Sequence, residues 1–165
     1  MPAPETRPVE APKGALMSEK TTVDEFVAQK KLALVGVSRT GKKYGNNAYR
    51  ELKARGYQVY AVHPGADTLE GDRAYPDLAS LPEKVDGLVI IVHPDQTEIV
   101  VRQAAEAGIA RIWMQPGSES VPAIQFCEQH NLSLVHGECI LMYAAPEGFH
   151  KFHGRLWKLL GKAPR

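Results

Sequence analysis

Residues 31–56 read KLALVGVSRTGKKYGNNAYRELKARG and set the expected architecture of the chain. The first part, Leu32–Val37, is a short continuous apolar run, which is typical of a strand buried on both faces of a sheet. The last part, Asn46–Arg55, predicts a helix, because Asn favours a helix start and Gly56 favours its end. A basic loop containing glycine joins the two. Strand, loop and helix in this order predict the first unit of a parallel sheet.

The same alternation continues toward the C-terminus. Apolar runs predict further strands at Tyr57–Val62, Gly87–Val92, Ile109–Met114 and Leu132–Val135. Helices are predicted from a cap at Asp95 to a stop at Gly108, and from the turn with Pro122 to about His130. A weakly extended segment near Arg73–Tyr75 and a helical turn near Leu78–Leu81 precede the third strand. This alternation predicts an α/β protein with a Rossmann-like, doubly wound parallel sheet of about five strands.

The length of 165 residues suits one domain, and the composition divides it into three parts. Residues 1–17 contain four prolines and are expected to be a disordered leader. Residues 18–148 form the expected α/β domain, which opens with a short helix after the capping box Thr22-x-x-Glu25. Residues 149–165 predict a basic amphipathic helix with five Lys or Arg and no acidic residue. We expect this helix to dock on its own domain or on another subunit, with a membrane surface as the less favoured alternative.

Composition excludes several classes of partner. The net charge of +1 argues against nucleic acid as a partner. No run of 18 apolar residues predicts a transmembrane helix, and the N-terminus lacks the apolar region of a secretory signal. Two cysteines are too few for a disulfide scaffold. A cytoplasmic location is the expectation.

The loop Gly36–Asn46 suits an anionic ligand. It contains three glycines and the cations Arg39, Lys42 and Lys43, and it leads into a helix start. Glycines let a backbone approach a phosphate, and free N–H groups of a helix start attract it. The alternative is a solvated turn with incidental basic residues. A nucleotide-hydrolysing P-loop is disfavoured because Lys43 stands where Ser or Thr would hold magnesium.

Classical dinucleotide binding is also disfavoured. The fingerprint G-x-G-x-x-G is missing, and the second strand ends in His63-Pro64 rather than an acidic residue. Proline follows the third and fourth strands as well, in His93-Pro94 and Gln115-Pro116. Because proline stops the ladder and turns the chain away, three such ends predict an open crevice along the carboxyl edge of the sheet, unless they only terminate strands.

Several motifs in order carry a resemblance to a known family. These are VGVS at Val35–Ser38, VHPG at Val62–Gly65, the tract from Gly71 to Tyr75 with LASLPEKVDGLVIIVHP after it, WMQPGS at Trp113–Ser118 and HGECILMY at His136–Tyr143. From about Val23 to Tyr143 the chain resembles the coenzyme A-binding domain family. It is similar to the N-terminal domain of the succinyl-CoA synthetase α subunit and to the small stand-alone bacterial members.

The resemblance implies that the chain binds coenzyme A (CoA) or an acyl-CoA at the carboxyl edge of the sheet. It implies that the first loop binds the phosphates of CoA and that His63-Pro64 borders the adenosine. Val92–Pro94 would line the opposite wall of the binding site, and Met114 and Gln115 would guide the pantetheine arm. The implied site comprises Gly36, Val37, Ser38, Arg39, Lys42, Lys43, Tyr44, Gly45, His63, Pro64, Val92, His93, Pro94, Met114 and Gln115. His63 departs from the family, which commonly has Asn before this proline.

The leading hypothesis is a non-catalytic module that acts as a carrier, a sensor or an interaction partner. Ligase activity is not carried over, because the chain has no room for the synthetase's second domain with its phosphorylated histidine. The alternatives are a subunit of an acyl-CoA-handling enzyme, such as a ligase or transferase, that borrows catalytic groups from another chain, or a binder of another nucleotide. The expected protein partner is a second copy of this chain, forming a homodimer, or a partner enzyme subunit.

No catalytic residue and no metal ligand is assigned. His136, Cys139, His150 and His153 are a weak metal pattern, because they offer only one cysteine and a Pro-Gly loop divides them. Cys139 follows the fifth predicted strand, where it could form a mixed disulfide with CoA. The competing interpretation is a small buried residue, as expected for Cys127.

Overall fold

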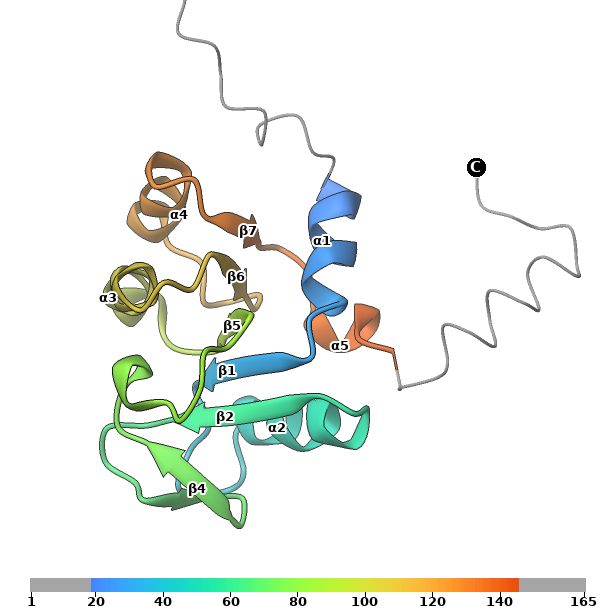
Figure 1. The fold of residues 1–165 in the computed structure, drawn as a ribbon, viewed down its shortest axis with the longest axis vertical. Coiled ribbons are helices and arrows are strands. Elements are labelled where there is room, and N and C mark those ends of the chain that lie inside the picture. The colour runs from blue at the N-terminus through green and yellow to red at the C-terminus, as the bar shows by residue number, and fades with distance from the viewer. Residues whose placement is uncertain (1–18, 146–165) are drawn as a thin grey trace, which may run out of the picture.

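The structure is a computed structural model that describes residues 19–145, an α/β domain with one sheet between two layers of helices (Figure 1). The strands are β1 (Lys31–Val35), β2 (Gln58–Val62), β3 (Thr68–Leu69), β4 (Asp72–Tyr75), β5 (Gly87–Ile90), β6 (Arg111–Met114) and β7 (Ser133–Val135). The helices are α1 (Glu19–Val27), α2 (Tyr44–Ala54), the 3₁₀ turn η2 (Leu78–Ser80), α3 (Pro94–Glu106), α4 (Val121–Gln129) and α5 (Ile140–Tyr143). The expected leader and the expected C-terminal helix lie outside the described residues.

The seven strands form a single sheet in the order β3-β4-β2-β1-β5-β6-β7. Every neighbouring pair is parallel except β3 with β4, which are antiparallel. The Rossmann-like parallel sheet predicted from the sequence is therefore confirmed. The prediction of about five strands omitted β3 and β4 as separate strands, since β3 has two residues and β4 is the weakly extended segment near Arg73–Tyr75.

Both faces of the sheet are covered by apolar side chains. On one face α1, α2 and α5 pack against the sheet, and Phe26 meets Trp113 edge to face at 5.3 Å between ring centroids. On the other face α3 and α4 cover a second cluster, which includes Leu88, Ile112 and Cys127 (Figure 1). This double coverage explains why the strands at the centre of the sheet are continuous apolar runs rather than alternating ones.

Three predicted helix starts are wrong by a few residues. Helix α2 begins at Tyr44 rather than Asn46, because Asn46 is wholly buried and bonds the preceding loop. Helix α3 has His93 as its N-cap rather than Asp95, since Pro94 fits the first helical position. Thr22 lies inside α1 rather than at its cap. Only for α2 does a tertiary contact accompany the earlier start, since Asn46 bonds Glu70 as well as the loop.

The sheet reverses its winding between β1 and β5. From β1 the chain crosses to β2 on one side, whereas β5 pairs with β1 on the other side. Gly36 follows β1 at this point with a φ of +128°, and a Cβ atom there would lie 2.1 Å from the carbonyl oxygen of Ile91. A Cβ on Gly45 would lie 2.0 Å from the carbonyl oxygen of Gly36. The loop after β1 is therefore held by backbone contacts that admit no side chain.

We predict that Gly45→Ala destabilises the protein by roughly 1–3 kcal/mol, as expected when added atoms meet backbone that cannot rotate away. Helix propensity alone predicts the opposite sign, because Ala is favoured over Gly within a helix by about 1 kcal/mol. Denaturant unfolding measures the difference. Gly65→Ala is the control, because a Cβ there meets only His63 side-chain atoms at 3.4 and 3.6 Å. A Gly45→Ala protein as stable as the parent would contradict the close contact.

Candidate functional site

The carboxyl ends of the six mutually parallel strands lie at one edge of the sheet, where open α/β sheets bind ligands. The loops at this edge follow β1, β2, β4, β5, β6 and β7. They bring together most of the predicted site residues, namely Gly36, Ser38, Arg39, Lys42, Lys43, Tyr44, Gly45, His63, Pro64, Val92, His93, Pro94 and Gln115. Val37 and Met114 are the exceptions, since they are at most 1% exposed and belong to the two cores.

Three exposed cations lie on the loop between β1 and α2. Arg39, Lys42 and Lys43 are all exposed, and within residues 19–145 none of them forms an ion pair. By contrast, the cations of α2 and of its C-cap are paired: Arg50 with Glu70, Lys53 with Asp72 and the C-cap Arg55 with Glu51. The loop therefore offers positive charge that no carboxylate of the described domain neutralises.

The start of α2 adds backbone donors beside these cations. Lys43 is the N-cap, but its side chain makes no capping bond. The N–H groups of Tyr44 and Gly45 have no hydrogen-bond acceptor among the described residues. Such N–H groups at a helix start carry partial positive charge and bind anions. The structure of the loop is thus suited to an anionic group.

A buried amide fixes the shape of this loop. Asn46 Oδ1 accepts hydrogen bonds from the backbone N–H of Ser38 at 3.1 Å and from Ser38 Oγ at 2.7 Å. Asn46 Nδ2 donates to the Ser38 carbonyl at 2.8 Å and to Glu70 Oε1 at 2.7 Å. Glu70 Oε2 in turn pairs with Arg50 at 2.9 Å. Hydrogen bonds from Arg50 and from Asn46 lower the pKa of Glu70, so it is ionised at neutral pH.

The two Val-His-Pro segments adopt similar local structures on either side of β1. His63 Nδ1 accepts from the N–H of Gly65 at 2.9 Å, and His93 Nδ1 accepts from the N–H of Asp95 at 3.4 Å. An Asn side chain makes the same kind of bond to a backbone N–H two residues on. His63 therefore supplies locally what the Asn expected from the family resemblance would supply.

Besides the basic loop and the two Val-His-Pro segments, the carboxyl edge contains a cluster of three polar side chains, Tyr44, Gln115 and Cys139. Gln115 Nε2 lies 3.0 Å from the Tyr44 hydroxyl and 3.1 Å from Cys139 Sγ, and its Oε1 accepts from the N–H of Ile140 at 3.2 Å. The Tyr44 hydroxyl lies 3.1 Å from Cys139 Sγ. Because Tyr44 is the first residue of α2, this cluster adjoins the basic loop.

The two cysteines have opposite electrostatic environments. Burial raises the pKa of Cys139, but hydrogen bonds from Tyr44, Gln115 and the backbone of Leu141 and Met142 outweigh it, and the net shift is downward. Burial in the core raises the pKa of Cys127 to about 11. Cys139 is thus the cysteine whose environment favours the reactive thiolate.

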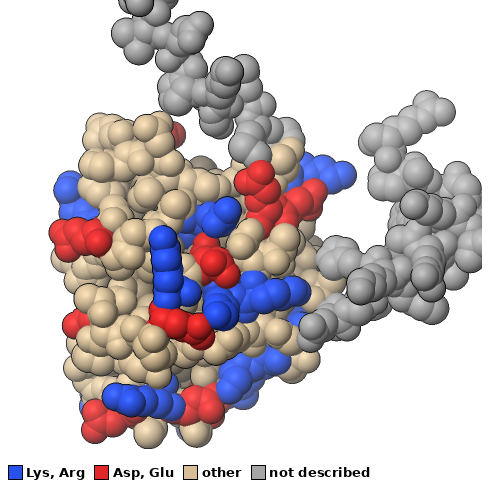
Figure 2. Space-filling view, viewed as in Figure 1, with Lys and Arg blue, Asp and Glu red and all other residues tan. Residues whose placement is uncertain are grey.

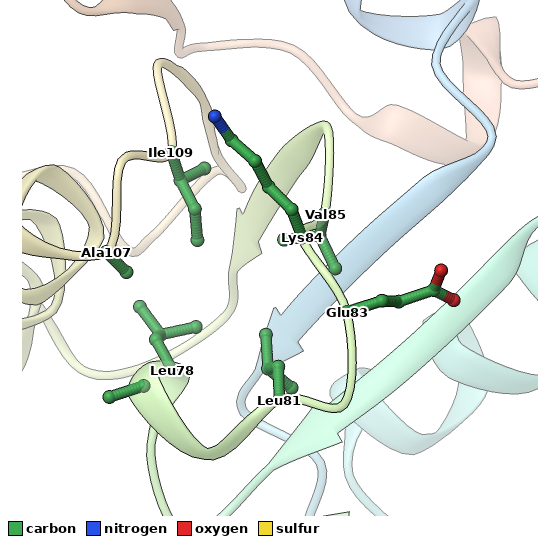
Figure 3. A pocket seen from close by; sticks show the side chains of 8 residues that line it. Leu78, Leu81, Glu83, Lys84, Val85, Ala107 and Ile109 are labelled. Atoms are coloured by element: carbon green, nitrogen blue, oxygen red, sulfur yellow. The ribbon is translucent and has the colours of Figure 1, made fainter.

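A separate pocket lies near the amino ends of β5 and β6, away from the strand ends just described (Figure 3). Its volume is about 410 Å³ and its lining is mostly aliphatic, with Leu78, Leu81, Val85 and Ile109 among the residues (Figure 3). It holds none of the predicted site residues. Basic and acidic side chains are interspersed over the face drawn in Figure 2, with no broad patch of one sign.

Two further features of the sequence concern a metal site and a membrane-spanning helix. Within residues 19–145 no group of three or more His, Cys, Asp or Glu could hold a metal ion, and His150 and His153 lie outside this range. None of the described helices is long and apolar enough to cross a membrane.

Comparison with known proteins gives a match over most of the chain. A family model described as a CoA binding domain matches residues 30–145. Acetate–CoA ligase (ADP-forming) II of Archaeoglobus fulgidus is 34% identical over 82 residues, covering 48% of this chain and 12% of the ligase. The α subunit of the Pyrococcus furiosus acetate–CoA ligase (ADP-forming) II is 27% identical over 88 residues, covering 53% and 19%. The chain thus spans less than a fifth of the length of these two relatives.

Among solved structures, a conserved hypothetical protein from Pyrococcus furiosus has a similar fold. It superposes with a TM-score of 0.66 at 37% sequence identity, and the match covers 68% of this chain and 97% of that chain. The similarity therefore includes a protein that consists of little more than the matched domain.

We predict that iodoacetamide alkylates Cys139 and leaves Cys127 unmodified in the folded protein. The reaction rate at Cys139 should reach half its maximum at a lower pH than in a free cysteine peptide, because hydrogen bonds stabilise its thiolate and lower its pKa. Peptide mass spectrometry across a pH series measures both rates. Tyr44→Phe removes one hydrogen bond to the thiol and should move the midpoint to higher pH. A midpoint at or above that of a free cysteine peptide would contradict this environment.

Proposed function

Because the chain belongs to the CoA binding domain family, we propose that it binds CoA or an acyl-CoA at the carboxyl edge of the sheet, as a non-catalytic carrier, sensor or interaction module. The observation that carries this proposal is the loop between β1 and α2. It combines the unpaired cations Arg39, Lys42 and Lys43 with a helix start whose first N–H groups have no acceptor among the described residues.

The physical basis is the phosphate charge of CoA. Exposed ion pairs contribute only about 0.2–1 kcal/mol each, and a helix start contributes a further 0.3–1 kcal/mol or so. Three cations and one helix start acting together on one polyanion are therefore enough to favour CoA over neutral compounds. These contributions are screened by salt, so affinity should fall as ionic strength rises.

The remaining parts of the edge suit the rest of an extended ligand. The His63-Pro64 and His93-Pro94 segments flank the loop on its two sides in the strand order β2-β1-β5. The thiol end of CoA would then run toward Gln115 and Cys139, which adjoin the loop through Tyr44. Under this proposal Val37 and Met114 support the site from within the core rather than contact the ligand.

A second candidate function is a subunit of an acyl-CoA-handling enzyme. The observation in its favour is that two curated relatives are acetate–CoA ligases, and one of them is a subunit. Under this proposal another chain would supply the catalytic groups for acyl transfer. Turnover assays with and without a candidate partner subunit distinguish the two functions.

We predict that calorimetric titration ranks CoA and acetyl-CoA ahead of NAD and ATP. Replacing Arg39, Lys42 and Lys43 together by Gln should weaken CoA binding by about tenfold or more, since each lost ion pair contributes a few tenths of a kcal/mol or more. The control replaces Lys20, Lys84 and Arg111 by Gln, which removes the same charge elsewhere. Preferential binding of NAD or ATP, or undiminished CoA affinity of the loop variant, would contradict the proposal.

A further inference from the structure

Glu70 lies in the turn between β3 and β4, outside every motif discussed in the sequence, yet its side chain reaches the loop after β1. Its backbone φ is +52°, which a non-glycine residue seldom adopts, and its side chain is 13% exposed. One carboxylate oxygen accepts from Asn46 Nδ2 at 2.7 Å and the other pairs with Arg50 at 2.9 Å. The carboxylate is thus held from two sides directly behind the loop.

An ionised carboxylate has no hydrogen to donate, and this helps to fix the orientation of the neighbouring amide. Asn46 Nδ2 donates to Glu70 and also to the Ser38 carbonyl at 2.8 Å, so its Oδ1 faces the N–H and the hydroxyl of Ser38. The N–H and the hydroxyl of Ser38 then both donate to Oδ1, at 3.1 and 2.7 Å. If the amide were reversed, Nδ2 would meet the N–H of Ser38, and two donors would face each other.

The same constraint extends along the loop. Ser38 Oγ has only one hydrogen, and Asn46 takes it. In the 2.9 Å contact between Ser38 Oγ and Thr40 Oγ1, the hydrogen must therefore come from Thr40. The N–H of Lys42 in turn donates to Thr40 Oγ1 at 3.4 Å. The Glu70 carboxylate, together with the Ser38 carbonyl, thereby sets the direction of successive hydrogen bonds within the loop.

We propose that Glu70 is a positioning residue for the phosphate-binding loop and acts through Asn46. The proposal rests on the function proposed above, since it assigns the loop to phosphate. It has a consequence for recognition. The hydroxyl hydrogens of Ser38 and Thr40 are both committed to the protein, so neither hydroxyl is left to donate to a phosphate, whereas the side chains of Arg39, Lys42 and Lys43 and the first N–H groups of α2 are.

A carboxylate beside an anion site could instead weaken binding by repulsion. Arg50 opposes this effect, because it pairs with Glu70 and its Nη1 also lies 3.5 Å from the carbonyl oxygen of Gly41. The two roles predict opposite changes in CoA affinity when Glu70 is replaced. Removing a positioning group weakens CoA binding, whereas removing a repulsive group strengthens it.

The first test needs no ligand. Amide hydrogen exchange at Ser38 is followed by NMR in the ligand-free protein. Glu70→Ala should accelerate this exchange by about tenfold or more, because one of the two acceptors that orient Asn46 is lost. Glu70→Gln should keep the exchange near the parent rate, since its Oε1 can still accept from Asn46. Arg50→Ala is the control, because it leaves the contact between Asn46 and Glu70 in place. Equal exchange in the parent and in Glu70→Ala overturns the proposal.

The second test measures CoA affinity of the same variants over a range of salt concentrations. Glu70→Ala should bind CoA about tenfold more weakly than the parent, with an unchanged salt dependence because the three loop cations remain. Glu70→Gln should stay within about threefold of the parent. Unchanged or tighter binding by Glu70→Ala overturns the positioning role. If the parent itself does not bind CoA, the proposed function fails, while the exchange result still decides whether Glu70 orders the loop.

If Glu70→Ala does not fold, a second set of variants tests the same contact by exchanging the acid and the amide between positions 46 and 70. Asn46→Asp alone sets two carboxylates against each other and should accelerate exchange at Ser38. Adding Glu70→Gln removes this repulsion, because Gln can donate to Asp, and should slow the exchange again, though not to the parent rate because the donor to the Ser38 carbonyl is still missing. If the double variant exchanges as fast as Asn46→Asp alone, the contact between residues 46 and 70 does not order the loop.

Discussion

Close contact between two backbone segments is the constraint on which the site depends. Gly36, which follows β1, packs against the backbone of Ile91 after β5. Gly45, at the start of α2, packs in turn against the backbone of Gly36. No side chain fits at either glycine. The contact brings the first turn of α2 and the loop before it to the point where the sheet reverses its winding. A ligand at the carboxyl edge would therefore meet backbone N–H groups and loop cations together.

The charges around this loop are distributed so that its own cations remain available. Acidic side chains near α2 are paired with Arg50, Lys53 and Arg55, one turn or more beyond the loop. The fixed hydrogen bonds of Ser38 give the loop one shape before any ligand arrives, which lowers the entropic cost of binding. A nearly neutral chain can thus present a locally positive site.

Much of the fold could be predicted from the sequence, because buried parallel strands leave continuous apolar runs such as Leu32–Val37. The basic loop was also identifiable, since glycines and cations lie together in the sequence. Glu70 could not be identified in this way, because it meets Asn46 across 24 residues of chain and through a two-residue strand. The burial of Met114 was likewise hidden, since a strand end can face the core or the edge. The roles of individual site residues toward CoA stay predictions.

A crystal structure of the protein with CoA tests the central claim most directly. The account predicts phosphate oxygens within hydrogen-bond distance of Arg39, Lys42 or Lys43 and of the first N–H groups of α2, with Ser38 still bonded to Asn46. Phosphates bound elsewhere, for example beside the pocket at the amino ends of β5 and β6, would contradict it.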